Sequence, residues 1–276
     1  MLKKVLLYAA VALPVAFSAF AAKADRLDEI KARGTLICGT LGTSEPFSFQ
    51  DRDSRQLVGY DVDICKIVAD SIGVEVEYKL LAVAARIPEL DSGRVDVVAA
   101  NLGWTPERAG QIDFSHRYYV TPQKLLVLAN SDFENAEDLA QSRIGATKGS
   151  SSEALLKERF PEARVIGYAD SPATFLSLQQ RKVDAQFASE LVLVRLMNQS
   201  PEGSPTRIIE ESLFDEPWGL GVRKGETALL EAANAALDET ETSGEAQQLF
   251  DKWFGADTPY DLTRSFTIGP IEGASN

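Results

Sequence analysis

Residues 87–100, IPELDSGRVDVVAA, and residues 175–188, FLSLQQRKVDAQFA, follow one pattern. Each stretch is typical of a helix end, a tight turn, a Val-Asp pair and then a buried strand. Two such units favour two similarly built lobes, although helix–turn–strand units look alike in many α/β proteins. Ligands of α/β folds bind beyond the carboxyl ends of strands, so Asn101 and Ser189, which follow the two strands, are predicted to face a cleft between the lobes.

The remainder of the chain alternates short β-rich runs with amphipathic stretches, which predicts an α/β fold with mostly parallel strands. Two apolar segments, 122–129 and 217–222, are expected to cross between the lobes. We therefore expect a first lobe over 25–126 and 217–255, a second lobe over 127–216, and a surface tail over 256–276. The strands are expected at 36–38, 74–78, 95–99, 144–146, 165–166 and 183–187, and the helices at 61–72, 87–90 and 152–160.

The composition sets limits on the function. The 276 residues include 28 basic and 41 acidic ones, for a net charge of -13, which disfavours nucleic acid and anionic membranes as partners. His116, Cys38 and Cys65 are too few soft ligands to predict a metal site or a cofactor. The two cysteines either form a disulfide or lie buried as small apolar side chains.

The first 24 residues are expected to be a secretory signal peptide. Lys3 and Lys4 precede an apolar run over 5–20, and the small-x-small patterns Ala-Phe-Ala and Ala-Lys-Ala follow. A membrane anchor is the alternative, but the run is short for a span. The mature protein is therefore expected outside the cytoplasm.

Several motifs occur in a fixed order: EPFSF at 45–49, GYDVDI at 59–64, TPER at 105–108, DFSHRYY at 113–119, KGSSS at 148–152 and KWFG at 252–255. Together they resemble the family 3 extracellular solute-binding proteins, the periplasmic amino-acid receptors of ABC importers, and most of all their glutamate/aspartate group. The resemblance implies a two-lobed periplasmic-binding-protein (Venus-flytrap) fold with two crossover strands. It also implies a periplasmic monomer that closes on a small ligand and docks on an ABC permease in the inner membrane.

The resemblance implies roles for four residues. Arg108 would hold the α-carboxylate of the ligand, because a planar guanidinium suits bidentate binding of a carboxylate. Ser150 and Ser151 open a predicted helix, whose free amides would approach the same carboxylate from the other lobe or serve only as caps. Tyr60 would stack on the ligand side chain, with core packing as the alternative.

Other matches concern specificity. Arg86 falls where the acidic receptors grip the side-chain carboxylate, whereas their second arginine is Leu41 here. The acid that holds the ligand α-ammonium is replaced by Ser189, with Glu190 beside it, and a hydroxyl-bearing residue is replaced by Gly103. Three explanations stay open: Glu190 turns in, backbone carbonyls near Asn101 and Gly103 suffice, or the ligand lacks an α-amine.

Two other functions compete with amino-acid import. An exported enzyme similar to the cyclohexadienyl dehydratases would need a general acid, for which Glu190, Glu45 and Lys148 are the candidates. None of them lies in a recognisable catalytic motif, so no catalytic residue is assigned and the chain is expected not to be an enzyme. A receptor that reports to a sensory partner is the second alternative.

Overall fold

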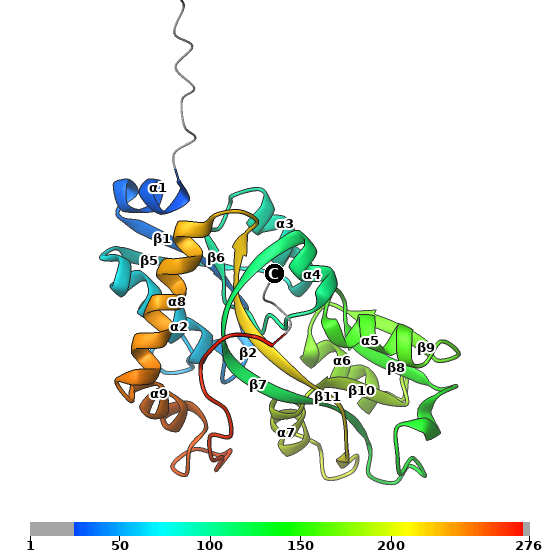
Figure 1. The fold of residues 1–276 in the computed structure, drawn as a ribbon. Helices are drawn as coiled ribbons and strands as arrows, with labels where there is room; N and C mark the ends of the chain where they lie inside the picture. Colours follow the sequence, from blue (N-terminus) through cyan, green and yellow to red (C-terminus); the bar gives the residue numbers. More distant parts are fainter. Residues whose placement is uncertain (1–24, 273–276) are drawn as a thin grey trace, which may run out of the picture.

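The computed structural model describes residues 25–272. The predicted signal peptide, residues 1–24, lies outside the described residues. The described part contains an eight-stranded mixed sheet with strand order β5-β1-β6-β11-β7-β10-β8-β9, flanked by helices (Figure 1). No helix among the described residues is long and apolar enough to cross a membrane.

The strands of the large sheet are β1 (Thr35–Thr40), β5 (Glu75–Leu80), β6 (Val97–Val98), β7 (Ile112–Leu128), β8 (Arg143–Thr147), β9 (Arg164–Tyr168), β10 (Ala185–Ser189) and β11 (Thr206–Arg223). A small sheet contains β2 (Thr43–Ser44), β3 (Ser48–Gln50) and β4 (Leu57–Val58). The helices are α1 (Arg26–Arg33), α2 (Tyr60–Ile72), η1 (Val83–Ala85), α3 (Arg86–Asp91), α4 (Pro106–Gln111), η2 (Glu137–Leu139), α5 (Ser151–Arg159), α6 (Ser171–Gln179), α7 (Glu190–Asn198), α8 (Thr227–Thr242) and α9 (Glu245–Phe254).

Two long strands join the halves of the sheet. β7 and β11 pair antiparallel from Ile112 opposite Arg223 to Leu128 opposite Thr206. The register shifts between the pairs Ile209–Leu125 and Phe214–Gln123, and the two strands curve side by side through the molecule (Figure 1). The predicted crossings are thus parts of two continuous strands, and the two-lobed α/β fold is confirmed.

The internal repeat of the sequence corresponds to equivalent positions in the sheet. β6 pairs parallel with β1 and antiparallel with β11, and β10 pairs parallel with β8 and antiparallel with β7. The repeated aspartates also act alike. Asp96 accepts a hydrogen bond from the Ile37 amide at 2.7 Å, and Asp184 accepts one from the Arg143 amide at 2.9 Å. The aspartate of each repeated Val-Asp pair therefore holds the neighbouring parallel strand, β1 in the first half and β8 in the second.

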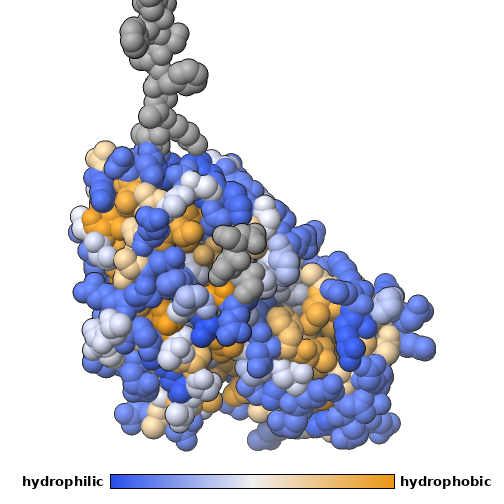
Figure 2. All heavy atoms as spheres, viewed as in Figure 1, coloured by the Kyte–Doolittle hydropathy of each residue, from blue (hydrophilic) through white to orange (hydrophobic). Residues whose placement is uncertain are grey.

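The C-terminal segment packs against the first lobe. Ile268 and Ile271 are buried, and Arg117 and Gly269 form an antiparallel bridge. The segment that was expected to be a surface tail therefore belongs, over its described residues, to the packed structure. In the space-filling view, hydrophilic residues cover most of the visible face of both parts (Figure 2).

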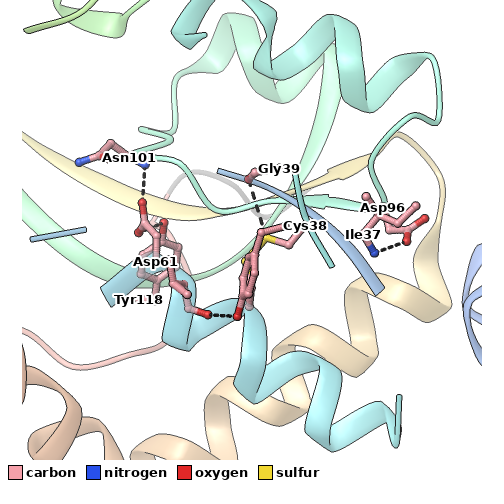
Figure 3. The surroundings of a disulfide bond; sticks show 10 residues. Ile37, Cys38, Gly39, Asp61, Asp96, Asn101 and Tyr118 are labelled. Carbon is pink, nitrogen blue, oxygen red and sulfur yellow. Dashed lines mark hydrogen bonds between the residues drawn. A yellow bond between two sulfur atoms is a disulfide. The ribbon is translucent and has the colours of Figure 1, made fainter. Parts of the chain in front are cut away.

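A disulfide links Cys38 of β1 to Cys65 of α2, with the Cα atoms 6.3 Å apart (Figure 3). Of the two alternatives left open by the sequence, the structure shows the pairing. The bond closes a loop with a sequence separation of 27 residues, so it restricts the unfolded chain.

We predict that reduction of this disulfide lowers the free energy of unfolding by about 3–4 kcal/mol, because the loop-closure entropy returns to the unfolded chain. Urea unfolding with and without dithiothreitol measures the change. A Cys38→Ala/Cys65→Ala variant serves as the control, since dithiothreitol should not alter its midpoint. Equal midpoints for the oxidised and reduced wild type would contradict the prediction.

Asp61, at the start of α2, is fully buried. Its carboxylate accepts hydrogen bonds from the backbone amide of Asn101 and from the Tyr118 hydroxyl, both at 2.9 Å (Figure 3). Burial raises the pKa of Asp61 from 3.8 to about 6, and the two hydrogen bonds oppose that rise. One buried carboxylate therefore links α2 to the loop that carries Asn101.

This raised pKa predicts a pH dependence of stability. Between about pH 4 and pH 6 the folded chain holds a proton on Asp61 that the unfolded chain has released, so the free energy of unfolding falls as the pH rises. Asp61→Asn removes this contribution. The difference in unfolding free energy between wild type and Asp61→Asn should therefore change through that window in urea titrations. A difference that is independent of pH would refute the assignment, and Asp70→Asn, exposed on the same helix, is the control.

Candidate functional site

A small cavity of about 70 Å³ lies where the two lobes meet. Five of the nine predicted site residues border it: Arg86, Asn101, Ser150, Ser151 and Ser189. Tyr60, Gly103, Arg108 and Glu190 do not border it. The structure thus brings together residues from both halves of the sequence repeat, as the fold predicts.

Arg86 begins α3 directly after the short helix η1, and only 3% of it is exposed. Its guanidinium donates hydrogen bonds to the carbonyls of Val83, Ala100 and Asn101 at 2.8–2.9 Å. A longer bond of 3.4 Å reaches the carbonyl of Gly149 in the other lobe. Arg86 therefore borders the cavity, but backbone carbonyls already engage its donors.

Arg108 lies in α4, which Thr105 caps by accepting a hydrogen bond from the Arg108 amide. Its guanidinium donates to the Gly103 carbonyl at 2.7 Å and to the Gly149 carbonyl at 3.1 Å. The loop at Gly149 comes very close to the first lobe, because a Cβ atom there would lie 2.8 Å from the Cα of Ala84. Both arginines of the first lobe therefore donate to one carbonyl of the second.

Neither of these arginines forms an ion pair within residues 25–272. Burial lowers the pKa of Arg86 to about 9, and repulsion from Arg108 adds to the shift. Burial likewise lowers the pKa of Arg108, while the charge of Glu216 opposes that change. A buried cation without a paired anion is costly, so the site is electrostatically suited to an added carboxylate.

The second lobe contributes the N-terminus of α5. The Ser150 hydroxyl accepts a hydrogen bond from the Glu153 amide at 3.1 Å, and the Glu153 carboxylate accepts one from the Gly149 amide at 2.8 Å. Ser150 therefore caps the helix, as one of the two sequence alternatives expected, and it also borders the cavity. Ser152 donates to the Gln123 side chain at 2.9 Å, which ties this helix to β7.

Asn101 follows β6 and Ser189 is the last residue of β10, and both border the cavity. Asn101 has a left-handed backbone with φ 49°, and its backbone amide donates a hydrogen bond to the Asp61 carboxylate. Both polar atoms of its side chain are buried without a hydrogen-bond partner. These atoms are therefore available to a polar ligand.

Glu190 does not turn into the cavity. Its carboxylate pairs with Lys124 at 2.7 Å, and its side chain is 37% exposed. Of the explanations considered for the missing acid at Ser189, this structure does not support the one that relies on Glu190, because a neighbouring lysine holds its charge outside the cavity.

Tyr60 lies in the aromatic core and not beside the cavity. It is fully buried, its ring centroid is 5.0 Å from that of Phe254, and its hydroxyl donates to the Tyr118 carbonyl at 2.8 Å. Ligand stacking by Tyr60 is thus not the arrangement in this structure, which instead matches the core-packing alternative.

Sequence reasoning missed three residues of the crossing strands. Gln123 of β7 and Glu216 and Trp218 of β11 border the cavity. The Glu216 carboxylate accepts hydrogen bonds from Gln123 at 2.9 Å and from the Trp218 indole at 2.7 Å. The only signal in the sequence was a single acid before an otherwise apolar stretch, EPWGLGV, which is too weak to identify a site.

A larger open hollow, of about 950 Å³, lies beside the C-terminal segment and includes Trp104. Trp104 borders this hollow and not the smaller cavity. None of the nine predicted site residues lines the hollow. The smaller cavity therefore remains the candidate site.

Residues 36–256 match the sequence profile of the bacterial extracellular solute-binding proteins, family 3. The L-cystine-binding protein TcyJ of Escherichia coli is 32% identical over 84% of this chain and 86% of its own length. The L-glutamate/L-aspartate-binding protein of Pseudomonas aeruginosa is 27% identical over 84% of this chain and 81% of its own length.

A similar solved structure is that of an ancestral amino acid-binding protein described as a precursor of cyclohexadienyl dehydratase. Its TM-score is 0.76 at 31% identity, and the match covers 84% of this chain and all of that one. The profile match spans most of the chain, and the relatives match nearly end to end. On this evidence, the chain belongs to the bacterial extracellular solute-binding proteins of family 3.

Proposed function

We propose that this chain captures a small α-amino acid with a polar or acidic side chain in the cavity between its lobes and delivers it to the permease of an ABC importer. The observation that carries the proposal is the pair of buried guanidinium groups, Arg86 and Arg108, that form no ion pair among the described residues. A ligand carboxylate supplies the missing charge, and it accepts hydrogen bonds more strongly than the Gly149 carbonyl does.

The size of the cavity supports a small ligand. One buried water needs about 10–15 Å³, so a cavity of about 70 Å³ has room for about five to seven waters, which favours a small solute. Asn101 and the serines of α5 add neutral polar groups that can fix the orientation of such a ligand.

The ligand side chain is the less constrained part of the proposal. The two relatives described above are named for cystine and for glutamate and aspartate. Arg86 lies at the cavity and favours an acidic side chain, whereas Leu41, which also borders the cavity, offers no charge. A polar or acidic amino acid fits this mixture best.

Export and transport complete the proposal. Cleavage after the predicted signal peptide would release a monomer into the periplasm, and N-terminal sequencing of the exported protein tests it. Deletion of the gene separates import from sensing: loss of amino-acid uptake supports import, whereas intact uptake with a lost transcriptional or chemotactic response supports a sensory role.

An enzyme on the same scaffold is the second candidate. Its general acid would have to reach the substrate, but Glu190, Glu45 and Lys148 do not border the cavity, and only Glu216 does so as a carboxyl group. Burial raises the pKa of Glu216, which suits a proton donor. The change in ultraviolet absorbance when a cyclohexadienyl substrate becomes aromatic would reveal turnover, and we expect none.

Our prediction for binding concerns Arg108. Arg108→Ala should weaken the best-bound amino acid by about 10- to 100-fold, because charge-assisted hydrogen bonds contribute about 1.5–3 kcal/mol. The affinity of Arg108→Lys should lie between those of wild type and Arg108→Ala, because lysine keeps the charge but lacks the planar guanidinium. Calorimetric titration of protein that was unfolded and refolded to strip ligand gives the dissociation constants for glutamate, aspartate, glutamine and cystine.

Arg164→Ala is the matched control, because it removes an exposed arginine from β9. It should leave every dissociation constant unchanged. Thermal unfolding of each variant confirms that it is folded. Equal affinity of wild type and Arg108→Ala for the same amino acid would exclude Arg108 from carboxylate binding.

A further inference from the structure

Glu216 is a buried acid at the cavity whose charge has no ion-pair partner among the described residues. It is 2% exposed, and its Oε2 atom accepts the hydrogen bonds from Gln123 and Trp218. The Oε1 atom is buried and accepts no hydrogen bond of good geometry, although the nearby Ser151 hydroxyl stabilises the ionised form. One oxygen of this carboxylate is therefore free to receive a donor.

Gly103 provides the space that this carboxylate occupies. A Cβ atom at Gly103 would lie 1.9 Å from Oε1 and 2.6 Å from Oε2 of Glu216. Any larger residue at 103 would force the carboxylate to move. The glycine and the glutamate therefore fit each other, and this pairing explains why no hydroxyl-bearing side chain is present at 103.

The charges around the cavity are arranged in two groups. Arg86 and Glu216 border the cavity with opposite charges, and Arg108, outside its lining, donates to the same Gly149 carbonyl as Arg86. Ser189 and Asn101, which also border the cavity, are neutral. Glu190, the other acid near Ser189, is already paired with Lys124. A ligand with one anionic and one cationic group would satisfy both sets of buried charges.

We propose that the Glu216 carboxylate is the anionic partner of a cationic group of the ligand, the α-ammonium of an amino acid, in place of an acid at Ser189. This inference rests on the proposed function, because it assumes that an amino acid enters the cavity. With this role for Glu216, the serine at position 189 does not require a ligand without an α-amine, because the carboxylate comes from β11.

A pH dependence follows from the position of Glu216. Burial raises the pKa of its carboxyl group above the usual value, while Ser151, Trp218, Arg108 and Arg86 oppose that rise. A bound ammonium favours the ionised carboxylate. Affinity for an amino acid should therefore fall as the pH is lowered through the raised pKa of Glu216, and affinity for an analogue without the amine should not.

The test uses three pairs of probes: L-glutamate with glutarate, L-glutamine with glutaramate, and L-arginine with 5-guanidinopentanoate. The second member of each pair lacks only the α-ammonium. Calorimetric titration of wild type and Glu216→Gln with all six compounds gives the dissociation constants. Glutamine keeps the size of the side chain and can still accept one hydrogen bond, so the cavity should be preserved.

In Glu216→Gln we expect affinity for the amino acid that binds best to fall about 10- to 100-fold, with little change for its deaminated analogue. An equal loss for L-arginine and 5-guanidinopentanoate would overturn the proposal, because Glu216 would then act on the side-chain cation and not on the α-ammonium. Glu210→Gln is the matched control, because it removes an exposed carboxylate, with 93% of the side chain accessible, from the same strand.

The outcomes separate this inference from the proposed function. If wild type binds an amino acid and Glu216→Gln binds it equally well, the role of Glu216 is overturned and amino-acid binding stands. If wild type binds none of the six compounds and neither aspartate nor cystine, the proposed function fails first. If Glu216→Gln does not fold, wild type decides: it should bind the amino acid more tightly than the deaminated analogue, and equal affinities for the two compounds overturn the proposal.

Discussion

The antiparallel pairing of β7 and β11 is the constraint on which the rest of the structure depends. These two strands lie at the centre of the sheet and run through both of its halves, so their pairing sets the position of one lobe relative to the other. The register shift beside Gln123 lies where the halves meet, and strand alternation places Phe214, Glu216 and Trp218 on one face of β11. The polar floor of the cavity is therefore a direct consequence of this pairing.

Where these strands are buried beside the cavity, any polar group that they present must find a partner. Ser152, Gln123, Glu216 and Trp218 form one hydrogen-bonded chain from α5 to β11, and most of their capacity is used within it. What remains, one oxygen of Glu216 and the side chain of Asn101, faces the same cavity as Arg86. Buried polar groups that lack partners are rare in folded proteins, so unpartnered atoms of two residues at one cavity are consistent with a binding site there.

The sequence predicted the fold well because the fold rests on local patterns. The repeated helix–turn–Val-Asp–strand units correspond to β6 and β10, and the aspartates at 96 and 184 have the same role in each half. It predicted the site less well. Tyr60 has an aromatic side chain that suits a core or a ligand equally, and only its packing against Phe254 decides between them. Glu216 belongs to the cavity through pairing with a strand almost a hundred residues away, and no local pattern reports such a contact.

The shared acceptor of the two arginines links binding to closure. Arg86 and Arg108 donate to the Gly149 carbonyl, so the lobes are bridged by the same donors that a ligand carboxylate requires. A ligand can shift the population of closed molecules only if the arginines bind it more strongly than they bind the Gly149 carbonyl, and only by that difference in free energy. A carboxylate is the stronger acceptor, which gives that difference the right sign. The ammonium then adds a second anchor on the strands that both lobes share, where its attraction to Glu216 holds the ligand between the lobes and does not depend on either one alone.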